Sequence, residues 1–192
     1  AFGTTTDNPH FGPCRNHWDP ARSPGGSSGG SGAALAAGLC AASLGTDTGG
    51  SIRIPAAACG VVGLKPTLGR VSRRGVVPLC WSLDTVGPMA RTVEDVALLM
   101  DAIAGPDPED ESCSSRPAEG FARELEAGVR GLALGAPREW FFDGLEPGVA
   151  AAAEAALAAL ESEGARRVEV AMPGMAEAHT AHHALLAVEA AA

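Results

Sequence analysis

The stretch RSPGGSSGGSGAALAAGLCAASLGTDTGGSIRIP (22–55) contains two clusters of serine and glycine, separated by an alanine-rich segment. Residues 31–43 combine helix formers with small side chains, which predicts a closely packed helix whose N-terminus receives the first cluster. The second cluster, TDTGGSIRIP, follows this segment at once. What these clusters do therefore decides both the fold and the chemistry.

Four interpretations of the clusters are open. Serine and glycine are typical of a flexible linker, but the second cluster adds a carboxylate, an arginine and a proline, for which a linker has no use. A phosphate-binding loop would need a Lys-Ser/Thr ending, which GGSSGGSG lacks. The run GGSSG (25–29) matches the nucleophile elbow of α/β-hydrolases, but two prolines in 18–24 disfavour the strand that an elbow requires. The fourth interpretation makes the clusters two halves of one catalytic site.

The composition excludes several classes of protein. A chain of 192 residues that is 46% hydrophobic can bury a core. Its net charge of −9 disfavours direct binding of nucleic acid or of an anionic membrane. No apolar run reaches the roughly 18 residues that a membrane span needs, and the polar start does not resemble a signal segment. We therefore expect a soluble, cytoplasmic protein whose five scattered cysteines are reduced thiols.

Two parts of the chain carry local signals for regular structure. In the first, CGVVGLKPT (59–67) is typical of a buried strand or extended segment, and TVEDVALLMDAIAG (92–105) predicts a helix capped by Thr92. In the second, 131–137 and 166–172 read as strands around a helix from Pro147 to Gly164. This strand-helix-strand order predicts a βαβ crossover and an α/β domain.

The organisation expected from these signals is one incomplete domain over 1–192. Its parts are a core with the active-site loops (1–105), a surface loop (106–118) and a strand-helix-strand-helix continuation (119–192). The chain opens without Met and stops in a helix-like run, so we expect a fragment cut at both ends.

Several further motifs follow the clusters in order. Ser27 and Ser28 lie between paired glycines, the run from Thr46 to Arg53 leads to a proline, and GLKPT and SLDTVGPMARTVED come next. Together they resemble the amidase signature family of serine amidases, up to about residue 105 and more loosely through 131–172. The resemblance implies an α/β fold with a mixed, twisted β-sheet covered by helices on both faces, and hydrolysis of a carboxylic amide bond.

The resemblance also implies the roles of the site residues. Ser51 would be the nucleophile, and Ser27, after a cis peptide bond from Gly26, would relay its proton to a neutral lysine. The oxyanion hole would consist of Thr48, Gly49 and Gly50. We expect four further residues to hold these loops in shape and to take no part in catalysis: Ser28, Ser31, Asp47 and Arg53.

The general base is the one departure from the family pattern. In the family the catalytic lysine lies upstream of the first serine cluster, whereas Lys65 is the only lysine here. Lys65 belongs to the separate motif GLKPT, which has no catalytic role. We therefore expect the complete parent protein to be an amidase and this segment alone to be inactive.

The histidines raise the question of a metal. His179, His182 and His183 would share one helix face, where two of them could bind zinc or nickel adventitiously. No acidic or cysteine pattern completes a catalytic site, so we expect neither a metal nor a cofactor.

Two alternatives to a general amidase acting on a small-molecule amide remain. The first is the A subunit of the glutamine-dependent aminoacyl-tRNA amidotransferase, which would bring partner subunits; Trp81 in LCWSLDTVGP (79–88) favours the general amidase, because that subunit tends to carry small residues there. The second is a non-catalytic scaffold with the same fold. A homodimer is left open.

Overall fold

The computed structural model describes residues 3–192, which form two compact units. One unit holds the residues up to 124 together with Ala184–Ala192, and the other is Leu125–His183. The expected single domain over 1–192 stays a prediction, and each unit is described by itself.

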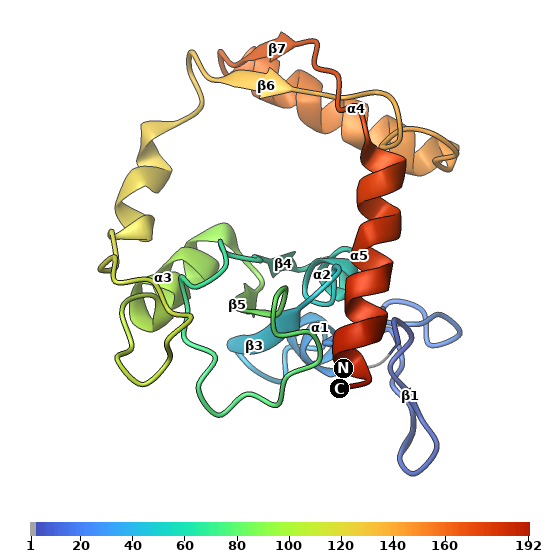
Figure 1. Ribbon diagram of the computed structural model, residues 1–192. Helices are drawn as coiled ribbons and strands as arrows, with labels where there is room; N and C mark the ends of the chain where they lie inside the picture. The colour runs from blue at the N-terminus through green and yellow to red at the C-terminus, as the bar shows by residue number, and fades with distance from the viewer. Residues whose placement is uncertain (1–2) are drawn as a thin grey trace. The chain divides into compact units, whose positions relative to one another are not determined.

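A three-stranded antiparallel sheet lies at the centre of the first unit (Figure 1). Its order is β3 (Ala42–Asp47), β5 (Thr85–Ala90) and β4 (Val62–Gly63). Asp47 pairs with Thr85 at one end of β3, so the segment after β3 and the segment before β5 leave the sheet side by side there. Every residue of the central strand β5 is buried.

Helices cover both faces of this sheet. On one face, Leu35 of α1 (Gly29–Ala36) and Ala56 of α2 (Arg53–Cys59) pack with Ile52 and with Met89 of β5. On the other face, Met100 of α3 (Val93–Ile103) packs with Val71 and Val86. Since Val86 and Met89 are an odd number of residues apart on one strand, they point to opposite faces. This arrangement accounts for the complete burial of β5 and agrees with the expected α/β fold class.

Three glycines of the sheet make room for Ile52, the neighbour of the predicted nucleophile. A Cβ atom at Gly45, Gly63 or Gly87 would lie 2.9–3.0 Å from a side-chain atom of Ile52. Each glycine comes from a different strand, so the side chain of Ile52, which is 0% exposed, fills a hollow in the sheet. The residue next to Ser51 is thereby held by the core.

The close packing predicted for 31–43 is present, although the helix α1 ends at Ala36 and 42–47 is a strand. A Cβ at Gly32 would lie 3.2 Å from Sγ of Cys59, so α1 and α2 approach closely because this position has no side chain. Thr92 caps α3 as predicted, its hydroxyl accepting a hydrogen bond from the Asp95 N–H at 3.0 Å.

The sequence analysis missed β3, α2 and β5, and it made β4 too long. Glycine and proline are typical of turns, yet Gly87 and Pro88 lie in the central strand, where the Pro88 carbonyl accepts the Leu64 N–H at 3.0 Å. Proline disrupts the interior of a helix, but Pro55 lies in the first turn of α2, where an N–H has no intrahelical partner.

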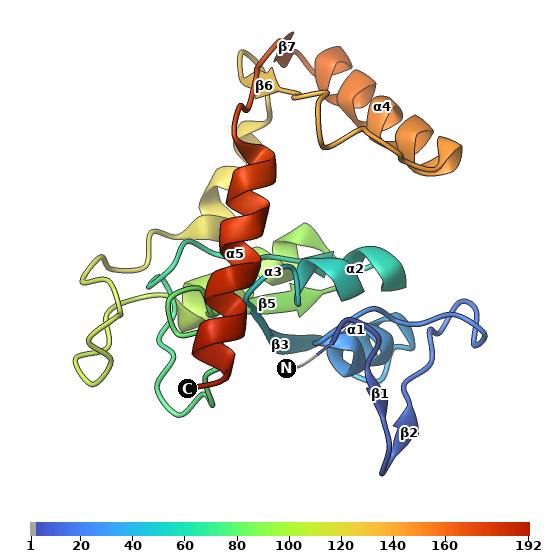
Figure 2. The ribbon, with the colours of Figure 1, turned by 45° about the vertical axis from the view of Figure 1, so that its right-hand side comes forward.

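The second unit contains the predicted crossover. Strands β6 (Ala133–Gly135) and β7 (Arg166–Val168) pair in parallel, and α4 (Pro147–Ser162) connects them and contacts β7 (Figure 2). The helix α5 (Met175–Ala190) follows. The first unit also contains the short strands β1 (Asp7–Asn8) and β2 (Gly12–Pro13), and a 3-10 helix (Phe121–Ala127) begins in it. Within residues 3–192, no helix is both long and apolar enough to cross a bilayer.

Candidate active site

One backbone hydrogen bond joins the two serine and glycine clusters. The N–H of Ser28 donates to the carbonyl oxygen of Ser51 at 3.0 Å. The peptide bond between Gly26 and Ser27 is cis, as the family resemblance implies. Ser27 and Ser51 are both half-buried. The structure thus places Ser28, the neighbour of Ser27, beside Ser51.

The first cluster has a defined conformation that only glycine permits. A Cβ at Gly26 would lie 2.9 Å from the side-chain oxygen of Thr6, and Gly25 adopts a φ of +77°. The hydroxyl of Thr6 also donates to the Gly25 carbonyl at 2.8 Å. These buried contacts are those of a packed segment and do not fit a flexible linker.

Asp47, which ends β3, organises the second cluster. Its carboxylate is 0% exposed and accepts the N–H groups of Gly50 (2.7 Å) and Ile52 (3.1 Å). The side chain of Arg53 adds two charge-assisted hydrogen bonds, of 3.0 Å from Nε and 2.9 Å from Nη2. Burial raises the pKa of the Asp47 carboxyl, but the hydrogen bonds from Arg53, Ile52 and Gly50 outweigh burial and hold that pKa below its ordinary value.

These contacts correct one part of the expected oxyanion hole. The Gly50 N–H points into the Asp47 carboxylate, so it is engaged within the protein and is not free to meet an oxyanion. The contribution of Gly50 is conformational, because its φ of +124° is one that other residues rarely adopt. Thr48 and Gly49, which is exposed, remain the candidate donors. Ser28 contributes a hydroxyl that donates to the Thr46 carbonyl at 3.4 Å.

Asp84 is a site residue that the sequence analysis did not single out. Its carboxylate is buried and accepts the hydroxyl of Thr48 and the N–H groups of Leu79 (2.7 Å) and Cys80 (3.0 Å). The signal was present, since Asp84 belongs to the motif SLDTVGP. The motif alone does not tell which residue the carboxylate contacts.

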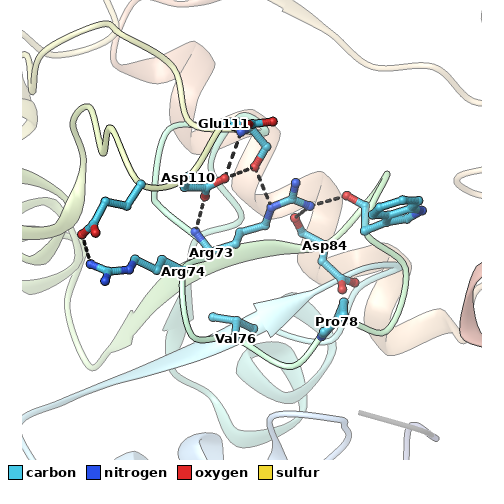
Figure 3. A pocket seen from close by; sticks show the side chains of 10 residues that line it. Arg73, Arg74, Val76, Pro78, Asp84, Asp110 and Glu111 are labelled. Atoms are coloured by element: carbon cyan, nitrogen blue, oxygen red, sulfur yellow. Dashed lines mark hydrogen bonds and ion pairs between the residues drawn. The ribbon is translucent and has the colours of Figure 1, made fainter.

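A cavity of about 280 Å³ borders Asp84 (Figure 3). Arg73 crosses it and donates from Nη1 to the Asp84 carbonyl at 3.2 Å. The indole of Trp81 contributes an apolar wall beside charged groups. The other lining residues are Arg74, Val76, Pro78, Glu109, Asp110, Glu111 and Ser112.

Lys65, the Cys80 thiol and the histidines are each described by their own contacts. Lys65 donates from Nζ to the Pro66 carbonyl at 2.8 Å. Burial, with the nearby Glu189 carboxylate, raises the pKa of the Cys80 thiol to about 11, so this thiol stays protonated at neutral pH. His179 and His183 face each other with 3.1 Å between their Nε2 atoms. Over residues 3–192, no group of three or more histidine, cysteine or acidic side chains could hold a metal ion.

The comparisons with known proteins identify the family of this chain. The family model Amidase matches residues 1–192. The A subunit of the glutamyl-tRNA(Gln) amidotransferase of Anaeromyxobacter sp. (strain K) is 55% identical over 173 residues, which cover 90% of this chain and 35% of that relative.

Two solved structures are also similar. The crystal structure of the glutamyl-tRNA(Gln) amidotransferase A subunit from Thermotoga maritima has a TM-score of 0.95 and 44% identity, covering 100% of this chain and 42% of that one. The native peptide amidase from Stenotrophomonas maltophilia has a TM-score of 0.86 and 38% identity, covering 97% and 39%. The chain therefore spans well under half the length of these proteins.

Proposed function

Because the chain belongs to the Amidase family, we propose that it carries the nucleophile and the oxyanion site of an enzyme that cleaves a carboxylic amide through an acyl-Ser51 intermediate. The observation that carries the proposal is the hydrogen bond from the Ser28 N–H to the Ser51 carbonyl, which sets the cis Gly26–Ser27 segment beside Ser51. Two clusters separated by an alanine-rich segment would thereby form one site.

The proposed reaction begins at Ser51. Its Oγ attacks the amide carbon while its proton passes to Ser27 and on to a lysine, which in the family lies upstream of the first cluster. The negative oxygen of the tetrahedral intermediate is stabilised by the N–H groups of Thr48 and Gly49. The C–N bond then breaks, the departing nitrogen takes a proton from Ser27, and water releases the acid from Ser51.

The amide cleaved is proposed to be that of glutamine, with ammonia as the product used by partner subunits. This choice rests on the relatives at 48–55% identity, which are named as A subunits of glutamyl-tRNA(Gln) amidotransferase. It reverses the preference that Trp81 suggested. The second candidate is a free-standing amidase, favoured by the exposed Trp81 indole, which lines the cavity beside Asp84.

The nucleophile is tested on the full-length parent protein with a fluorophosphonate probe and peptide mass spectrometry. We expect the label on Ser51 and none in Ser51→Ala. Ser27→Ala is expected to lose at least about a hundredfold in turnover, the usual size of general acid–base catalysis. The matched control is Ser31→Ala, whose hydroxyl donates to the Leu44 carbonyl at 3.1 Å, outside the proposed chemistry.

Each other outcome selects an alternative. Labelling of Ser27 in place of Ser51 would favour the nucleophile elbow, and no labelling of the folded protein would favour the non-catalytic scaffold. Ammonia release from glutamine that requires co-purified partner subunits would support the amidotransferase assignment. Hydrolysis of a peptide amide by the protein alone, without glutaminase activity, would support the free-standing amidase.

A further inference from the structure

We infer that Asp84 is a positioning residue that fixes Thr48, and through it the proposed oxyanion loop 48–50. The inference rests on the function proposed above and adds a residue to it. The inference is based on the sheet register. Asp47 pairs with Thr85, so Thr48 and Asp84 are opposite each other just beyond the end of the β3–β5 ladder. There the hydroxyl of Thr48 donates to Oδ1 of Asp84.

The Asp84 carboxylate is itself held in place. Only 5% of the residue is exposed, and Oδ2 accepts the N–H groups of Leu79 and Cys80 at 2.7 and 3.0 Å. Because these two hydrogen bonds fix the Asp84 side chain in one rotamer, its Oδ1 atom is already oriented to accept the Thr48 hydroxyl. Hydrogen bonds to a carboxylate are also stronger than those between neutral groups.

The turn that carries Asp84 is braced from outside. The N–H of Asp84 donates to the Cys80 carbonyl at 2.7 Å, and the Asp84 carbonyl accepts Nη1 of Arg73 at 3.2 Å (Figure 3). The backbone N–H of Arg73 donates in turn to Oδ2 of Asp110 at 2.7 Å. A series of hydrogen bonds therefore links Thr48 to Asp84, Asp84 to Arg73, and Arg73 to Asp110 in the loop at 106–118.

Two buried carboxylates thus hold the oxyanion loop at its two ends. Asp47 takes the N–H of Gly50, and Asp84 takes the hydroxyl of Thr48. Oxyanion donors stabilise the transition state only when they are oriented before the reaction. Loss of the Asp84 contact should therefore lower kcat and leave KM nearly unchanged, because substrate binding does not use the developing charge.

The test measures kcat and KM for ammonia release from glutamine by the full-length parent protein with its partner subunits. We expect Asp84→Ala and Thr48→Val each to lower kcat by about tenfold to a hundredfold, less than the loss of a donor itself. Since both remove the same contact, the double variant should be no slower than the slower single variant. Asp84→Asn should recover part of the loss, because its amide can donate to the Thr48 hydroxyl while its oxygen accepts the two N–H groups.

The matched control is Asp101→Ala. Asp101 also accepts two backbone N–H groups, those of Phe121 (2.5 Å) and Ala122 (3.2 Å), but it holds the start of the 3-10 helix Phe121–Ala127. A loss of kcat in this variant equal to that in Asp84→Ala would reduce the role of Asp84 to general stability and overturn the inference.

Two further results would also overturn the inference. One is a wild-type kcat in both single variants, and the other is a double variant whose loss is the product of the single losses. If Asp84→Ala does not fold, the inference is tested by the kcat values of the shape-conserving variants Thr48→Val and Asp84→Asn. Failure of the proposed function is seen separately, as a wild-type protein without label on Ser51.

Discussion

Asp47 shows how a single buried charge can shape a catalytic loop. Its carboxylate turns the backbone of residues 50–53 toward itself and pairs with Arg53, whose side chain is 53% exposed. The sequence analysis expected a loop-shaping role for both residues. It could not foresee that the Gly50 N–H is used in this way, because the direction of an N–H depends on the local backbone conformation.

Asp47→Asn is expected to destabilise the parent protein by about 1–3 kcal/mol at pH 7, because the new NH₂ group faces buried donors. The folded-state pKa of Asp47 is depressed, so its stabilisation is complete above the ordinary value of 3.8 and is lost as pH falls through the lower folded value. Urea unfolding at neutral and acidic pH measures this difference, which should shrink at acidic pH.

The matched control for that change is Asp19→Asn. Asp19 and Arg22 form an exposed ion pair, with side chains 49% and 80% accessible, so its loss should cost under about 1 kcal/mol. Equal unfolding free energies for the two variants would contradict the role given to Asp47.

The central strand β5 depends on glycine at the scale of the element. A Cβ at Gly87 would lie 2.1 Å from the Leu64 carbonyl oxygen and 3.0 Å from Cδ1 of Ile52. Gly87→Ala should therefore separate β5 from the neighbouring segment and destabilise the protein by about 3 kcal/mol or more. Thermal and chemical unfolding measure this change.

Gly30→Ala in α1 is the matched control. A Cβ there would have no neighbouring atom within 4 Å, so the substitution should stabilise the helix by about 0.5–1 kcal/mol. If Gly87→Ala were as stable as Gly30→Ala, the packing argument for β5 would be wrong.

The elements differ in how far the sequence predicts them. Helices α3 and α4 carry their own signals, a threonine cap and a proline at the first position, and both were predicted. Strand β3 contains a glycine, and β5 contains a glycine and a proline, which locally favour turns. They are strands because each pairs with the other and is covered by helices, and this tertiary contribution exceeds local propensity.

At the scale of the molecule, the prediction concerns the general base. Lys65 is the only lysine in residues 1–192, and its Nζ donates to the Pro66 carbonyl. The segment expressed alone should therefore show no amide turnover, whereas the full-length parent should be active and its Ser51→Ala variant inactive. Ammonia release with glutamine measures all three. Turnover by the segment that disappears on Ser51→Ala would contradict the need for an outside lysine.

The sequence by itself determined the family, because its motifs are residue types in a fixed order, and the resemblance to that family implied the cis bond before Ser27 that the structure contains. It also determined α3, α4 and the crossover, whose signals lie within a few residues. Only the tertiary structure decided that the Gly50 N–H is engaged, that three glycines surround Ile52 and that Asp84 meets Thr48. These contacts arise from strand pairing between distant segments, and pairing is set by the burial of both faces of the sheet, which no local pattern encodes.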